Sequence, residues 1–136
     1  MELKDIDNDV ILKSIIKYAS TNLDIEVMWL YGSRATGASQ AHSDYDLAIA
    51  FKDFSLSDFE KRIRPNQLAL ELSSSLGIPS EKLSIVDINQ VPIYLSYSIV
   101  EHGKIIYQLP SSRAHKEFVR ISAIFEHQKR DLSNER

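Results

Sequence analysis

The chain has 136 residues, enough for one domain with one hydrophobic core, and its 43% hydrophobic and 26% charged residues are typical of a globular protein. Sixteen Lys and Arg against 19 Asp and Glu give a net charge of −3, which argues against a nucleic-acid backbone as the main partner. There is no cysteine for a disulfide, no apolar signal segment at the start and no run near the ~20 apolar residues of a membrane span. We therefore expect a single cytoplasmic domain over residues 1–136, with no membrane and no direct nucleic-acid contact.

Apolar residues at helical spacing alternate along the chain with short apolar runs. Asp5 or Asp7 is expected to cap the first helix, and Pro65 is expected to kink or break the longest one near Arg64. The alternation predicts an α/β domain in which helices cover a small mixed sheet, with the last strand at its edge. In chain order we expect a helix at 5–22, a strand at 26–31, a short helix at 34–37, a strand at 44–51, a helix at 57–76, a strand at 82–88, a helix at 92–101, a strand at 104–107 and a helix at 112–130.

Two acidic residues lie at the start of the second predicted strand. Asp44 and Asp46 are two apart, so their side chains share one face, ~6.5–7 Å apart along the strand. Carboxylates on one face repel each other unless a cation lies between them, and oxygen ligands of this kind suit Mg²⁺. Gly32 and Ser33 offer a flexible backbone and a hydroxyl at a helix start, where phosphate oxygens bind readily. The alternative is a polar surface turn with two solvated carboxylates.

The order Gly32-Ser33, ten residues, then Asp44-x-Asp46 resembles the signature of the nucleotidyltransferase superfamily related to DNA polymerase beta. The wider GSRATG sequence and the short chain resemble its minimal nucleotidyltransferase branch, whose members often act as antitoxins beside HEPN-domain toxins. This resemblance implies a polymerase beta palm-like fold. It also implies a third acidic residue on a later strand, and Asp87 is the position that matches. The alternative for Asp87 is a cap for the helix that follows.

Basic residues near the motif have two interpretations each. Arg34 either contacts the substrate phosphates or is a solvated arginine on a helix. Lys61, Arg62 and Arg64 form the densest basic run, which we interpret as a solvated helix face. Contact of this run with an acidic partner or with ATP phosphates is the alternative.

The resemblance implies a metal-dependent transfer. Asp44, Asp46 and Asp87 would hold two Mg²⁺ ions, which clamp the attacking and leaving oxygens of a displacement at phosphorus. ATP would be the co-substrate, and AMP would pass to a tyrosine hydroxyl of a cognate HEPN ribonuclease toxin, in complex with this antitoxin. Two other functions stay open: an antitoxin that acts by steric binding alone, and a nucleotidyltransferase that modifies a small molecule.

Overall fold

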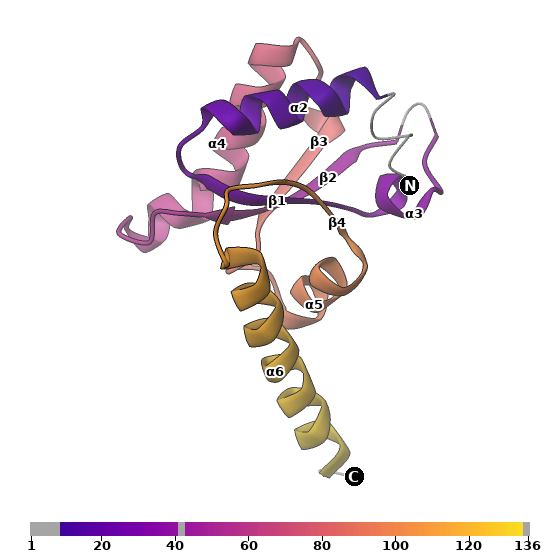
Figure 1. Ribbon diagram of the computed structural model, residues 1–136, viewed down its shortest axis with the longest axis vertical. Helices are drawn as coiled ribbons and strands as arrows, with labels where there is room; N and C mark the ends of the chain where they lie inside the picture. The colour runs from indigo at the N-terminus through magenta and orange to yellow at the C-terminus, as the bar shows by residue number, and fades with distance from the viewer. Residues whose placement is uncertain (1–8, 41–42, 135–136) are drawn as a thin grey trace.

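The computed structural model describes residues 9–40 and 43–134, and four strands form one mixed sheet in the order β3-β2-β1-β4 (Figure 1). β1 pairs antiparallel with both β2 and β4, whereas β2 and β3 are parallel. The expected small mixed sheet flanked by helices is confirmed, with the last strand at an edge. The elements are α2 (Val10–Thr21), β1 (Ile25–Tyr31), α3 (Ser33–Thr36), β2 (Tyr45–Phe51), α4 (Asp58–Leu76), a 3-10 turn (Ser80–Lys82), β3 (Leu83–Asp87), α5 (Ile93–His102), β4 (Lys104–Gln108) and α6 (Arg113–Asn134).

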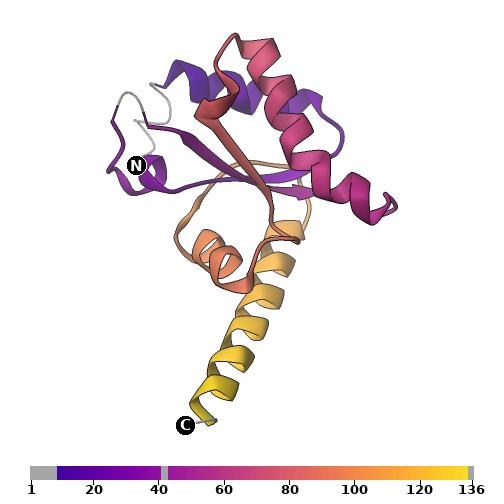
Figure 2. The ribbon, with the colours of Figure 1, turned by 180° about the vertical axis from the view of Figure 1, so that it is seen from behind.

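Each face of the sheet has its own hydrophobic core. α2 and α4 cover one face, α5 and α6 cover the other, and α6 projects beyond the body of the domain (Figures 1 and 2). Because side chains alternate along a strand, Leu47 and Ile49 of β2 pack toward α2 and α4. Ala48 packs on the opposite face, beside Trp29, and Asp46 shares that face. None of the helices in the described ranges is long and apolar enough to cross a bilayer.

The helix boundaries follow the capping rules. The Asp9 carboxylate accepts a 2.9 Å hydrogen bond from the Leu12 amide and caps α2, while the predicted caps Asp5 and Asp7 lie outside the described residues. α4 does not break: it continues through Pro65, which is buried with the face that packs on the sheet. Burial of this face offsets the roughly 3 kcal/mol that an internal proline costs a helix.

A buried arginine joins α6 to the sheet. The Arg113 guanidinium forms ion pairs with Glu26 at 2.9 Å and with Glu117 at 3.0 Å. It also donates 2.8 Å hydrogen bonds to the Phe51 carbonyl oxygen and the Asn89 side-chain oxygen. Burial raises the pKa of Glu117, but the hydrogen bonds from its neighbours outweigh burial and leave this pKa below its ordinary value. Arg113 therefore fixes the base of α6 to β1, through Glu26, and to the end of β2, through the Phe51 carbonyl oxygen.

We expect Arg113→Ala to lower the free energy of unfolding by about 1.5–3 kcal/mol, because it removes the charge-assisted hydrogen bonds that join α6 to Glu26 and to the Phe51 carbonyl oxygen. Arg120→Ala is the matched control: Arg120 also pairs with Glu117, at 2.7 Å, but its side chain is 43% exposed. Its loss should cost less than about 1 kcal/mol. Urea denaturation of the three proteins measures both values, and equal costs for the two variants would contradict the role given to Arg113.

Candidate active site

The site forms where β1 ends and β2 begins. Tyr31 is the register partner of Asp46, and Gly32 follows with a left-handed φ of 73°. The Asp46 carboxylate packs directly against the Gly32 backbone, and a Cβ at position 32 would overlap its Oδ2. Ser33 then opens α3, so the Gly32-Ser33 pair and Asp46 lie side by side, as the sequence predicts. Glycine is required here for two independent reasons, its φ angle and the space that the carboxylate occupies.

Asp44 and Asp46 form a like-charged pair. Asp44 is exposed just before β2, and Asp46 is half-buried on the α5 and α6 face. Burial, and then the charge of Asp44, raise the pKa of Asp46 above its ordinary value. The fold therefore keeps two carboxylates together although their charges oppose it.

Arg34 has a structural role. It is not solvated: only 7% of the residue is exposed, and its guanidinium stacks 3.9 Å from the centre of the Tyr45 ring. It donates a 2.7 Å hydrogen bond to the Ser43 carbonyl oxygen and lies 3.5 Å from the Asp9 carboxylate. Arg34 thus holds the backbone that presents Asp44. The interpretation of Arg34 as a solvated residue is wrong, and its contact with substrate phosphates stays a prediction.

Asp87 lies away from the other two carboxylates. Its register partner is Ile49, three residues along β2 from Asp46, a separation of about 10 Å. It also belongs to the opposite face, where its carboxylate lies 3.6 Å from Arg64 of α4 and accepts a 2.9 Å hydrogen bond from the Asn89 amide. The structure therefore does not bring Asp87 to the acid pair. The alternative interpretation, a cap for the helix that follows, is wrong as well, because α5 begins only at Ile93, after Pro92, and has no side-chain cap. Asp87 instead closes the turn after its strand through the Asn89 amide.

Two hydroxyl residues beside Asp46 are absent from the sequence-based prediction. Ser84 of β3 is the register partner of Asp46, and Tyr31 flanks Asp46 from β1. Burial, and then the Asp46 charge, raise the pKa of Tyr31, and the nearby Ser84 side chain offsets part of this rise. Because side chains alternate along a strand, the sequence could have placed Ser84 and Asp87 on opposite faces of the sheet. Only the pairing of β2 with β3 shows that Ser84 lies beside Asp46.

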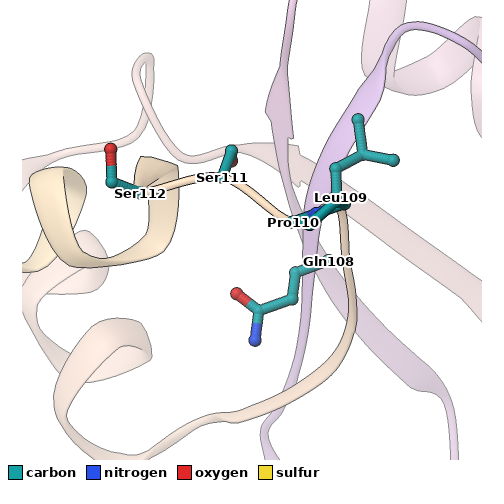
Figure 3. Close-up of a pocket in the computed structure, with 5 residues that line it drawn as sticks. All are labelled: Gln108, Leu109, Pro110, Ser111 and Ser112. Atoms are coloured by element: carbon teal, nitrogen blue, oxygen red, sulfur yellow. The ribbon is translucent and has the colours of Figure 1, made fainter.

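A cavity of about 290 Å³ opens beside the motif on the α5 side of the sheet. Its lining comes from the end of β1, from α3 and from the last turn of α5: Tyr31, Gly32, Ala35, Thr36, Ser98, His102 and Gly103. A larger hollow of about 630 Å³ lies at the other end of the sheet, lined by residues 108–112 of the β4–α6 connection (Figure 3). Because one continuous loop lines that hollow and none of the motif residues contributes to it, the smaller cavity is the one connected with the chemistry.

The acid pair has the ligand chemistry for a divalent cation. Mg²⁺ in proteins is commonly held by one or two carboxylates, with water and substrate phosphates completing its shell. Asp44 and Asp46 meet that requirement, and the charge repulsion seen at Asp46 is what a cation would relieve. Within residues 9–40 and 43–134, no group of three acidic or histidine side chains gathers that could hold a metal ion. The residues therefore fit a cation shared with phosphates better than a three-carboxylate centre.

The family described as polymerase beta, nucleotidyltransferase, matches residues 13–111, which include the whole site. The chain belongs to this family. It is also 30% identical over 97 residues to protein adenylyltransferase MntA of Aphanizomenon flos-aquae (strain 2012/KM1/D3). That match takes in 68% of this chain and 63% of the relative, so the chain spans less than two thirds of the curated protein it resembles.

Solved structures show the same fold as this nucleotidyltransferase. A chain in the crystal structure of a toxin–antitoxin with AMP-PNP superposes with a TM-score of 0.70 at 23% identity, covering 90% of this chain and 92% of that chain. A chain in the complex of MNT antitoxin with tri-AMPylated Shewanella oneidensis HEPN toxin gives 0.64 at 20% identity, with 90% and 89% covered. At these identities the likeness establishes the nucleotidyltransferase fold.

We expect Gly32→Ala to reduce nucleotidyl transfer by about 100-fold, because the new Cβ pushes the Asp46 carboxylate out of place. Gly77→Ala is the matched control: Gly77 has a similar φ of 67° and ends α4, and a Cβ added there would meet no atom within 4 Å. That change should cost about 1–2 kcal/mol of stability and leave transfer intact. The transfer rate and the free energy of unfolding of both variants test this prediction. Equal transfer rates for the two variants would contradict the steric role of Gly32.

The stability of the nucleotidyltransferase without metal should depend on pH through Asp46. A raised pKa means that the folded state disfavours the ionised form, so the cost is present at neutral pH and disappears below about pH 4, where the group is protonated in both states. Asp46→Asn should therefore melt a few degrees higher than the parent at pH 7, with no difference at pH 3. Thermal unfolding in EDTA across this range tests the sign, and a lower melting temperature for the variant at pH 7 would refute it.

Proposed function

We propose that this chain is an antitoxin that transfers AMP from ATP to a tyrosine hydroxyl of a cognate HEPN ribonuclease toxin and thereby neutralises it. The observation that carries the proposal is the pair Asp44 and Asp46, kept together at an open sheet end against Gly32, in a chain similar to an adenylyltransferase. The similarity to chains of toxin–antitoxin complexes supports a hetero-oligomer with the toxin.

The residues of the site divide the work of transfer among them. Asp44 and Asp46 would hold Mg²⁺ together with the ATP phosphates, and the ion would supply charge stabilisation at the reacting phosphoryl group. Gly32 leaves the space in which Asp46 sits, and Arg34 fixes the backbone before Asp44. The cavity next to Gly32 is the space available for a substrate group beside the acid pair.

The transfer needs no covalent intermediate on the protein. The acceptor oxygen forms a bond to the α-phosphorus, the bond from that phosphorus to the bridging oxygen breaks, and pyrophosphate leaves with its electrons. The acceptor proton passes to solvent. Alignment and charge stabilisation supply the acceleration, in keeping with a site built from two carboxylates beside a glycine backbone.

Asp44→Asn and Asp46→Asn should each reduce AMP transfer by about 100-fold or more, because each removes charge at the reacting centre. The assay incubates each variant with the HEPN toxin, Mg²⁺ and labelled ATP, and follows label on the toxin and its ribonuclease activity. Tyr→Phe substitutions in the toxin identify the acceptor.

The same assay separates the competing functions. Loss of label together with loss of neutralisation supports adenylylation as the mechanism. Full neutralisation by the Asp44→Asn, Asp46→Asn double variant would favour steric binding instead. Transfer to small hydroxyl compounds with no label on the toxin would point to a small-molecule nucleotidyltransferase.

A further inference from the structure

Three neighbouring strands place Tyr31, Asp46 and Ser84 in one row across the sheet. Tyr31 pairs with Asp46, and Asp46 pairs with Ser84, so the three side chains share the α5 and α6 face. Ser84 is exposed, and Tyr31 is half-buried. The position on β3 that adjoins the acid pair is therefore taken by a neutral hydroxyl.

No other residue of β3 can take that position. Leu83, Ile85 and Asp87 point to the opposite face, where the first two join the core under α2 and α4 and Asp87 meets Arg64. Val86 shares the face of Ser84 but pairs with Ala48, two residues further along, and packs into the core beneath α5. Paired residues on neighbouring strands lie about 5 Å apart, within reach of one cation bound between their side chains.

We propose that Ser84 makes this a two-carboxylate centre, which binds a divalent cation weakly by itself and tightly only when nucleotide phosphates add their oxygens. A third carboxylate at position 84 would hold the cation without nucleotide. With serine at this position, the additional negative charge around the cation has to come from the phosphates of the substrate. The proposal depends on the proposed function only for the choice of ATP as nucleotide.

The test is Mn²⁺ binding to the isolated full chain, followed by the electron paramagnetic resonance signal of the free ion, with and without AMP-PNP. We expect weak binding by the parent protein and binding at least about tenfold tighter in its AMP-PNP complex, once binding of Mn²⁺ to free AMP-PNP is subtracted. Ser84→Asp should bind Mn²⁺ about tenfold more tightly than the parent without nucleotide, because it adds a unit charge beside the cation. It should also gain less from AMP-PNP.

Two control variants separate charge at this position from other effects. Ser84→Asn has nearly the size of aspartate but no charge, and Ser57→Asp adds the same charge at the start of α4, where aspartate also caps a helix. Both should bind Mn²⁺ within about twofold of the parent. Thermal unfolding with and without Mn²⁺ gives a second reading: Ser84→Asp should melt lower in EDTA and gain the most from the metal.

Ser84→Asp binding no more tightly than Ser84→Asn, or tight Mn²⁺ binding by the parent without nucleotide, would overturn the proposal. The proposed adenylylation of a toxin stands or falls separately, because no toxin and no transfer enter these measurements.

Discussion

The approach of the Asp46 carboxylate to the Gly32 backbone is the constraint on which the site depends. It requires the β1–β2 register that pairs Tyr31 with Asp46, and it requires a residue without a side chain at the turn into α3. The same contact makes Asp46 half-buried and raises its pKa, so the geometry that brings the carboxylate to the motif also makes its charge costly. The free protein bears that cost, and a cation relieves it.

Acidic side chains are paired with arginines at one end of the sheet and lie next to each other at the opposite end. At the far end, the buried carboxylates of Asp87 and Glu117 lie against Arg64 and Arg113. The ion pairs Arg64–Asp87 and Arg113–Glu26 join α4 and α6 to the strands. At the near end, Arg34 is engaged by the Ser43 carbonyl oxygen and Asp9, and the charges of Asp44 and Asp46 oppose each other. Ion pairs with arginine therefore stabilise the fold at the far end. At the near end, the repulsion between Asp44 and Asp46 marks the candidate functional site.

Much of this arrangement is readable from the sequence because it is local. Residues two apart at a strand start share a face in any sheet, and the spacing of Gly32-Ser33 to Asp44-x-Asp46 identifies the family. Asp87 shows the limit: its distance from Asp46 depends on the register of a parallel pair joined through α4, which a single sequence does not specify. Arg64 shows a second limit. Its position in a basic run predicts a solvated side chain, yet its guanidinium stacks on the Phe51 ring in the interior.

One carboxylate joins the start of α2 to α3 and to the start of β2. Asp9 caps α2 through the Leu12 amide, lies 3.5 Å from Arg34 and accepts hydrogen bonds of 2.9 and 3.0 Å from the Tyr45 hydroxyl. Burial and the bond to Asp9 raise the pKa of Tyr45 to about 12, so this donor keeps its proton at any physiological pH. Fraying of the first turn of α2 would therefore remove contacts that hold Arg34 and Tyr45 in place next to Asp46. We therefore expect hydrogen exchange at the start of α2 to respond to changes around Asp46.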